Sequence, residues 1–314
     1  MRRLDRKDIV FVVTGATGWL GRVSLDYLNR RFGSDFDRRV VAFASKAGAV
    51  TLTSGKMVSY RALASIGDLP RGRYVFLHCA FLGKERVQNL SLTDFVRLNE
   101  MISRKVCETA RRVEVDGFFV PSSGAVYSDG GNLEDDLERN PYGVMKRRDE
   151  ERFGNLAEEL GVPLVMPRVF NIAGSYINKL NSYALSSIIT DILARRPVVL
   201  RAAHPVVRSY VHAGDLIALA LACLEEGRRE TLLFDTAGEV EIEVGDLARL
   251  ALEVMGATGA IVRPPMQEGA VPHRYVGDGT TMLRLAAQYN IHFRPLPEQV
   301  RETADFMRHE SLRL

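Results

Sequence analysis

Residues 9–21 read Ile-Val-Phe-Val-Val-Thr-Gly-Ala-Thr-Gly-Trp-Leu-Gly, and this stretch decides the fold. Its first six residues form a short apolar run that predicts a buried strand, and apolar residues from Leu20 onward recur at near-helical spacing. Glycines spaced as these three are permit a tight turn, close approach of the backbone to a pyrophosphate and close helix–strand packing. A helix N-terminus also offers unpaired N–H groups to an anion. We therefore expect a dinucleotide to contact Gly15, Thr17, Gly18, Trp19, Leu20 and Gly21.

Further apolar runs continue the pattern along the chain. They are uniformly apolar, as parallel strands covered on both faces are, and long helical stretches separate them. A repeated strand–helix–strand order predicts a doubly wound sheet. The stretch 47–73 is poorly patterned and yields no element. We expect strands at 39–44, 74–80, 117–121 and 163–169, and helices at 89–115, 142–160, 182–195, 213–226, 245–255 and 297–309.

The expected fold class is α/β, a doubly wound parallel Rossmann sheet with a smaller C-terminal α+β substrate domain. Beyond about residue 174 the alternation of strand and helix weakens, and no low-complexity linker separates the parts. We expect the dinucleotide-binding domain to comprise 1–174 with about 208–236. The substrate-binding domain would comprise about 175–207 with 237–314.

Composition limits the classes of function. Of the 314 residues 46% are hydrophobic and 26% charged, and the formal net charge of +3 indicates no nucleic-acid partner. Cys79, Cys107 and Cys223 are widely spaced and odd in number, which indicates neither a disulfide framework nor a zinc site, so we expect a cytoplasmic protein. Scattered histidines predict no metal site. No apolar run approaches the roughly 18 residues of a membrane span, so no membrane partner is expected.

The end of the second predicted strand bears on the choice between NAD and NADP. A carboxylate there would bind the ribose 2′-hydroxyl of NAD, whereas a cation would accept the 2′-phosphate of NADP. The sequence has no acid at this place and continues with Ser45 and Lys46, which suit a phosphate. We therefore expect both to contact NADP, with Arg22 as a helper. NAD stays the alternative.

Two further motifs point to catalysis. Tyr142 and Lys146 are four residues apart, hence on one face of a helix, and a cation near a phenol lowers the phenol's pKa. A phenol so activated is a suitable acid/base for interconverting an alcohol and a ketone. Ser123 follows an apolar strand, so its hydroxyl is expected at the carboxyl edge of the sheet, where ligands bind. Ser123, Tyr142 and Lys146 are our candidate catalytic residues.

Read together, these motifs occur in the order of one known family. They include Leu77-His78-Cys79-Ala80, Pro167-Arg168-Val169-Phe170-Asn171 and the segment 208–215, which reads Arg-Ser-Tyr-Val-His-Ala-Gly-Asp. From about Val10 to beyond Asp215 the chain resembles the extended short-chain dehydrogenase/reductases, particularly the nucleotide-sugar epimerase/dehydratase group.

The resemblance implies roles for individual residues. Tyr142 would be the acid/base, Lys146 its partner that binds the cofactor ribose, and Ser123 the group that polarises the substrate oxygen. Asn99 would take the structural or proton-relay asparagine position near the cofactor. Cys79 and Ala80 would also contact the cofactor, and the substrate would meet Phe81, Ser123, Gly124, Asn171, Arg208 and Arg274, the two arginines gripping a nucleotide diphosphate. The helices at 89–115 and 142–160 would form a homodimer interface.

The chain also departs from the family pattern. Gly124 and Ala125 stand where family dehydratases carry Asp-Glu, so a 4,6-dehydratase is disfavoured. The leading hypothesis is an NAD(P)-dependent oxidoreductase acting on a nucleotide-linked sugar, with a keto-sugar reductase favoured over an NAD-dependent 4-epimerase. Two hypotheses of a different kind stay open. One is a non-enzymatic NADP-sensing or scaffold protein, and the second is an enzyme acting on a non-nucleotide alcohol or ketone.

Overall fold

The computed structural model describes residues 3–87, 89–128, 131–180 and 183–311. The chain divides into two compact units. The first comprises Met1–Val169 with Ile217–Phe234, and the second Phe170–Leu216 with Asp235–Leu314. That the first binds a dinucleotide and the second a substrate stays a prediction.

The first unit is built on a mostly parallel sheet, which confirms the expected fold class. Its strands lie in the order β13-β8-β6-β5-β1-β2-β4-β3, with β7 beside β8. The chain places β2 and β4 on one side of β1 and then crosses to β5 on its other side, so the carboxyl ends of β1 and β5 flank a topological switch point, where ligands bind in such sheets. The strands are β1 (Ile9–Thr14), β2 (Val40–Ala44), β3 (Gly48–Thr51), β4 (Met57–Ala62), β5 (Arg73–His78), β6 (Glu114–Phe119), β7 (Ser122–Ser123), β8 (Leu164–Val169) and β13 (Thr231–Asp235).

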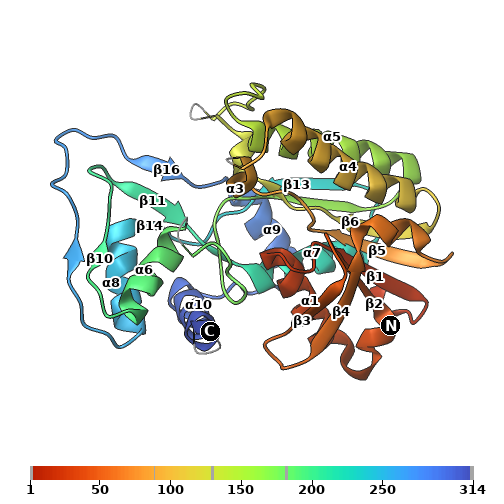
Figure 1. The fold of residues 1–314 in the computed structure, drawn as a ribbon, viewed down its shortest axis with the longest axis horizontal. Helices are drawn as coiled ribbons and strands as arrows, with labels where there is room; N and C mark the ends of the chain where they lie inside the picture. Colours follow the sequence, from red (N-terminus) through yellow and green to blue (C-terminus); the bar gives the residue numbers. More distant parts are fainter. Residues whose placement is uncertain (1–2, 88, 129–130, 181–182, 312–314) are drawn as a thin grey trace. The chain divides into compact units, whose positions relative to one another are not determined.

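Helices cover both faces of this sheet. Figure 1 shows α4 and α5 side by side on one face, with α1 and α7 on the other. Buried aromatic residues such as Phe76, Phe118 and Phe153 form the core under α4 and α5. The helices are α1 (Trp19–Phe32), α2 (Phe36–Arg39), α3 (Lys84–Val87), α4 (Leu92–Ala110), α5 (Pro141–Leu160) and α7 (Ala213–Glu226), with short 3-10 turns at η1 (Arg3–Asp5), η2 (Gly33–Asp35), η3 (Leu63–Asp68) and η4 (Gly124–Val126).

One expectation about this unit was wrong, and one stretch had been left without an assignment. The helix expected over 89–115 ends at Ala110, because Glu114 and Val115 already belong to β6, where Val115 pairs with Tyr74. The poorly patterned stretch 47–73 contains the hairpin β3–β4 and the turn η3. This hairpin forms the edge of the sheet, with β3 antiparallel to β4, and most of its β3 residues are exposed. An exposed edge lacks the apolar run by which the buried strands were recognised.

The second unit consists of helices and short strands. Strands β14, β11 and β16 form one small sheet in that order, and β10–β15 and β12–β9 form pairs. Helix α9 had not been expected, and the expected helix start at Ser182 lies outside the described residues. The elements are β9 (Ile172–Ala173), α6 (Ala184–Leu193), β10 (Val198–Val199), β11 (Val206–Ser209), β12 (Val211–His212), β14 (Glu241–Glu243), α8 (Val244–Val254), β15 (Ile261–Val262), β16 (His273–Tyr275), α9 (Thr280–Gln288) and α10 (Leu296–Ser311).

Candidate active site

The glycine turn joins the carboxyl ends of β1 and β5. Gly15 has a φ of +70°, and a Cβ there would lie 2.7 Å from backbone atoms of Cys79 and Ala80. Thr14 Oγ1 accepts a hydrogen bond from the Ala80 N–H at 3.2 Å, and Thr14 O accepts one from the Cys79 N–H at 3.2 Å. Only glycine permits this approach at this φ. The predicted turn residue Gly15 and the predicted residues Cys79 and Ala80 are thus brought together.

The residues at the start of α1 fit a pyrophosphate. Gly18 is the N-cap of α1, no side chain caps it, and no acidic side chain lies in the first turn. A helix start without a side-chain cap leaves N–H donors and the positive end of the dipole to an anion. A Cβ at Gly21 would lie 2.0 Å from Gly15 O, so only glycine lets α1 pack this closely on the turn. Thr17 is exposed beside these groups, whereas Trp19 is buried and Leu20 half-buried.

Ser123 ends β7 and begins the turn η4, which lies against the start of α5. Its Oγ accepts a hydrogen bond from the Ala125 N–H at 3.1 Å. Asn140, the N-cap of α5, donates to Ala125 O at 2.7 Å and accepts from the Gly143 N–H at 3.0 Å. A Cβ at Gly143 would lie 2.0 Å from Ala125 O. The predicted residues Ser123 and Gly124 therefore lie where η4 meets the first turn of α5, which carries Tyr142.

Asn140 and Gly143 were missed by the sequence analysis although both position this site. The signal was present, because an asparagine followed by proline is a typical N-cap with proline at the first helical position. Gly143 has no such signal, since its closeness to Ala125 arises only in the folded chain.

Lys146 lies one turn beyond Tyr142 on α5 and is buried, with 8% of its surface exposed. Its Nζ donates to Pro121 O at 2.8 Å and lies 4.0 Å from the centroid of the Phe81 ring. The Phe81 ring stands edge-on to the Tyr142 ring, with centroids 5.7 Å apart. The predicted residues Phe81, Tyr142 and Lys146 thus form one cluster.

The charge of Lys146 acts on three neighbouring titratable groups, Asp149, His78 and Cys79. Burial raises the pKa of Asp149, while the positive charge of Lys146 and a hydrogen bond from Ser103 act against that rise. Burial lowers the pKa of His78 to about 3, so its imidazole is neutral at physiological pH. Burial also raises the pKa of Cys79 to about 12, which makes its thiol inert as a nucleophile.

Asn99 is fully buried on α4 and uses both ends of its amide. Its Oδ1 accepts from the Leu82 N–H at 2.8 Å, and its Nδ2 donates to Phe95 O at 3.2 Å. These bonds tie the segment after β5 to α4. Of the two roles implied for Asn99, they favour the structural one.

The carboxyl end of β2 carries Ser45 and Lys46, both exposed. Within the described part of the chain Lys46 has no ion-pair partner, and no acidic residue follows β2 before β3 begins at Gly48. Arg22 on α1 donates to Thr51 O at 3.1 Å, which directs this side chain to the β3–β4 hairpin. The end of β2 lies beside the glycine turn, because the Ala16 N–H donates to Phe43 O at 2.9 Å. Ser45 and Lys46 therefore place a solvent-exposed positive charge next to that turn.

An ion-pair network centred on Glu150 and Arg168 packs next to the candidate site. Glu150 on α5 accepts two hydrogen bonds from Arg168 on β8, at 2.8 and 2.7 Å, and one from Ser122 Oγ at 2.5 Å. Arg168 also donates to Tyr127 Oη at 2.6 Å. The network connects α5, β8 and the segment on either side of Ser123.

The remaining predicted residues belong to the second unit and gather around Tyr275. Asn171 donates to Tyr275 O at 3.2 Å, and Arg208 lies over the Tyr275 ring, 5.8 Å from its centroid. Arg208 also donates to the backbone oxygen of His273 at 3.1 Å. Arg274 is exposed and forms an ion pair with Glu241, in which its Nε–Oε2 distance is 2.8 Å. Arg274 would have to leave Glu241 to bind a diphosphate.

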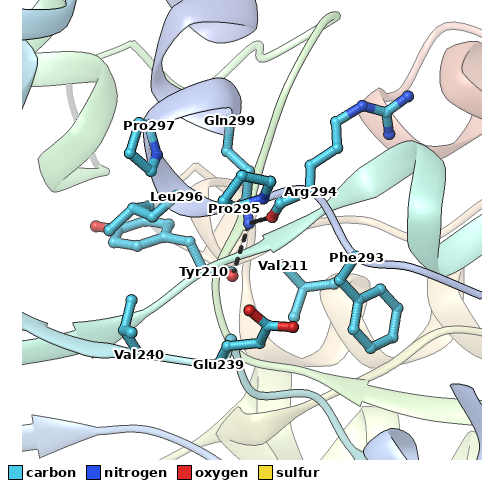
Figure 2. A pocket seen from close by; sticks show the side chains of 11 residues that line it. Tyr210, Val211, Glu239, Val240, Phe293, Arg294, Pro295, Leu296, Pro297 and Gln299 are labelled. Atoms are coloured by element: carbon cyan, nitrogen blue, oxygen red, sulfur yellow. Dashed lines mark hydrogen bonds between the residues drawn. The ribbon is translucent and has the colours of Figure 1, made fainter. Parts of the chain in front are cut away.

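The second unit also contains a pocket of about 150 Å³ that the sequence analysis did not anticipate. Figure 2 shows its lining, which is largely apolar, with Gln299 at one side. Gln299 Nε2 donates to Tyr210 O at 3.2 Å and to Arg294 O at 2.8 Å, so the amide is held firmly. The other lining residues are Val211, Gly238, Glu239, Val240, Phe293, Pro295, Leu296 and Pro297.

Comparison with known proteins identifies the family. Residues 11–232 match the model of the NAD dependent epimerase/dehydratase family, and the chain belongs to this family. By its description, this is a family of NAD-dependent enzymes.

Two curated relatives are similar in sequence. One is a UDP-2-acetamido-2,6-beta-L-arabino-hexul-4-ose reductase of Pseudomonas aeruginosa, 22% identical over 77% of this chain and 56% of that protein. The other is a dTDP-4-dehydro-6-deoxy-D-allose reductase of Streptomyces bikiniensis, 23% identical over 59% of this chain and 52% of that protein. The chain thus spans a little over half the length of these relatives.

Solved structures share the fold over nearly the whole chain. A UDP-glucose-4-epimerase of Stenotrophomonas maltophila, solved with NAD and formylated UDP-arabinopyranose, has a TM-score of 0.76 at 17% identity and covers 97% of this chain and 99% of its own. A UDP-N-acetylglucosamine 4-epimerase of Methanobrevibacter ruminantium, in complex with UDP-N-acetylmuramic acid, has a TM-score of 0.73 at 18% identity, with coverages of 96% and 99%. At these identities the likeness concerns the fold.

No helix among the described residues is both long and apolar enough to cross a membrane.

Proposed function

We propose that this enzyme reduces a keto group on a nucleotide-linked sugar with NADPH, and that Ser123, Tyr142 and Lys146 carry the chemistry. The observation that carries the proposal is the buried Lys146 ammonium, which lies one helical turn from Tyr142 and is linked to it through the Phe81 ring. The bound cofactor would supply the hydride that adds to the sugar carbon. The three side chains would handle the oxygen and its proton.

Tyr142 would donate its phenolic proton to the oxygen of the reduced carbon. An ammonium held near a phenol in a buried site favours the phenolate, which makes proton release at neutral pH easier. Lys146 has three N–H donors, one of which goes to Pro121 O. An ammonium also suits the hydroxyl oxygens of the cofactor ribose.

Ser123 would hold the substrate oxygen in place. Its Oγ already accepts from the Ala125 N–H, and no described group accepts from its hydroxyl hydrogen. A serine hydroxyl has one donor. That hydrogen would therefore point to the reacting oxygen and polarise the carbonyl. In the second unit, Asn171, Arg208 and Arg274 would bind the nucleotide part of the substrate.

Preference for NADP rests on Lys46. It is an exposed cation at the carboxyl end of β2 without an acidic neighbour, and this is where a 2′-phosphate would lie. A reductase exchanges its cofactor every turnover, whereas a 4-epimerase retains it. The relatives from Pseudomonas aeruginosa and Streptomyces bikiniensis are both named reductases, which favours the same reaction class here.

We further propose a homodimer through α4 and α5, which a single monomer peak in solution sizing would contradict.

The test begins with the purified enzyme. Denaturing it and identifying any released dinucleotide separates the two reactions, because firmly retained NAD points to the 4-epimerase. Absorbance at 340 nm is then followed with NADPH and a series of 4-keto-sugar nucleotides. Consumption of NADPH supports the reductase, and interconversion of sugars without consumption overturns it.

The role of Tyr142 is tested with Tyr142→Phe, which removes the hydroxyl and keeps the ring contact with Phe81. Loss of a general acid lowers kcat by about 10²–10⁴-fold. Tyr74→Phe is the matched control, because the Tyr74 hydroxyl donates to Pro70 O at 2.9 Å and Tyr74 is not among the residues assigned to the reaction. If Tyr142→Phe retains the wild-type kcat, the assignment is wrong.

A further inference from the structure

Phe81 contacts both Tyr142 and Lys146, the two residues to which we assign proton transfer in the proposed reaction. Its ring centroid lies 4.0 Å from Lys146 Nζ, and its ring meets the Tyr142 ring at an interplanar angle of 84°. Tyr142 and Lys146 belong to α5, whereas Phe81 belongs to the segment that follows β5. A side chain from another part of the fold thus connects the two.

The contact with Lys146 has the features of a strong cation–π interaction. The face of an aromatic ring attracts a cation, and the attraction is greater where water is excluded. Lys146 is buried here, and a distance of 4.0 Å is well inside the roughly 6 Å range of such contacts. Pro121 O fixes the ammonium by a hydrogen bond, and the ring adds a second constraint from a different direction.

The position of Phe81 is itself defined by neighbours. Its ring packs edge-on against the fully buried Phe95, with centroids 6.5 Å apart. The next residue, Leu82, donates its N–H to Asn99 Oδ1 at 2.8 Å. Both contacts come from α4. Phe81 is therefore a ring held in a fixed place and half-buried beside the proposed catalytic pair.

We propose that Phe81 is a positioning residue that holds the Lys146 ammonium beside Tyr142, rather than a residue whose main role is to contact substrate. The inference rests on the proposed function of Tyr142 and Lys146. It changes the role expected for Phe81 from the sequence. Replacing the ring by an aliphatic side chain removes the cation–π contact with Lys146 and keeps its hydrogen bond to Pro121 O.

Nuclear magnetic resonance tests the contact without any substrate. The chain has seven lysines, so carbon-13 labelling at lysine Cε gives a simple spectrum, and Lys146→Arg assigns the Lys146 signal. A proton above an aromatic ring is shifted upfield by the ring current. We expect the Lys146 Hε signal upfield of those of the other lysines in the wild type and in Phe81→Tyr, and among them in Phe81→Leu. A wild-type signal that is not displaced overturns the inference, even if the leucine variant does not fold.

A matched control is Phe32→Leu. Phe32 is also half-buried and lies under a guanidinium, with Arg39 Cζ 4.3 Å from its centroid. It is not among the residues assigned to the reaction. Phe32→Leu is expected to leave the Lys146 signal in place. A Lys146 signal displaced equally by Phe32→Leu and Phe81→Leu would count against a specific contact.

Kinetics test the consequence. Phe81→Leu is expected to lower kcat about tenfold with little change in KM, and Phe81→Tyr to restore it. A raised KM with unchanged kcat would overturn the positioning role in favour of substrate contact. If the wild type turns over no nucleotide sugar at all, the proposed function fails, and the Lys146 signal still decides whether Phe81 holds the ammonium.

Discussion

Arg168 and Glu150 form a bidentate ion pair, in which the Arg168 side chain is 14% exposed and the Glu150 side chain 7%. The pair joins β8 to α5, where Glu150 lies four residues, or one helical turn, beyond Lys146. Its bonds to Ser122 and Tyr127 reach both sides of Ser123. This salt bridge therefore fixes the strand that ends at the proposed catalytic serine against the helix that carries the tyrosine and lysine.

Removing one partner of this pair is expected to destabilise the protein strongly. Arg168→Met leaves the Glu150 carboxylate buried without its cation, at a cost of about 3–5 kcal/mol. The control is Arg111→Met, because Arg111 pairs with Glu159 between α4 and α5 at 2.6 Å, with both side chains nearly half exposed. An exposed pair contributes about 0–1 kcal/mol. Urea unfolding measures both, and equal losses would show that the buried pair is not special.

Glycine at position 21 is expected to be indispensable for packing α1 on the turn. Gly21→Ala places a Cβ 2.0 Å from Gly15 O, a backbone atom that cannot rotate away. Overpacking of this kind costs about 1–3 kcal/mol, and here it also displaces the glycine turn to which we assign the cofactor phosphates. We expect a lower melting temperature together with loss of NADPH binding, measured by cofactor fluorescence.

The matched control is Gly154→Ala on α5, where a Cβ would meet nothing within 4 Å. Alanine is favoured over glycine inside a helix by about 1 kcal/mol, so this variant is expected to melt higher. Opposite signs for the two variants support the packing argument. A melting temperature for Gly21→Ala at or above the wild-type value contradicts it.

Lys46 is expected to distinguish the two cofactors. Lys46→Ala removes the positive charge that would face the 2′-phosphate of NADPH, whereas NADH has no such phosphate. One exposed ionic contact contributes about 1 kcal/mol, so the Kd for NADPH is expected to rise about fivefold. The difference is expected to shrink at high salt because exposed charges are screened. Titrating NADPH and NADH measures it, with the exposed Lys7→Ala as control. Equal weakening of both cofactors would leave the NADP preference without support.

The buried strands and the motif spacing were predictable from the sequence because each depends on local pattern. The run 9–14 became β1, and Tyr142 and Lys146 share one face of α5 because a helix repeats every 3.6 residues. The edge hairpin was not predictable, since β3 is mostly exposed and Val58 is the one buried residue of β4, so neither strand forms an apolar run. The helix expected to run to Val115 ends at Ala110, because Glu114 and Val115 already belong to β6.

Contacts between distant segments were the part that the sequence could not provide. Phe81 follows β5 and its ring lies over a lysine 65 positions further along the chain, which no spacing rule reveals. Arg274 was expected to grip a diphosphate, yet its partner in the fold is Glu241. Both flank β11, where Val207 pairs with Arg274 and Ser209 with Glu241. Such partners follow from sheet order, and sheet order in turn follows from packing.

Stability of the second unit is expected to fall in acid because of Glu302. Burial alone would raise the pKa of Glu302, but the nearby His212, whose Nε2 lies 3.0 Å from Oε2, and a hydrogen bond from Ser175 Oγ at 2.9 Å outweigh it and lower that pKa to about 2. A folded-state pKa below the unfolded value stabilises the protein above the unfolded pKa of about 4.5. That stabilisation is lost as pH falls from about 4.5 to about 2. Because 37% of the side chain is exposed, solvent screening reduces its size.

Glu302→Gln isolates this contribution, because glutamine keeps the shape and an acceptor oxygen but cannot titrate. We expect the variant to unfold at lower urea than the wild type at pH 7, and the gap to close between pH 4.5 and pH 2. Glu298→Gln, exposed on the same helix, is expected to leave the pH dependence as it is. Curves for Glu302→Gln and the wild type that stay parallel down to pH 2 would mean that the carboxylate at position 302 does not stabilise the fold through His212.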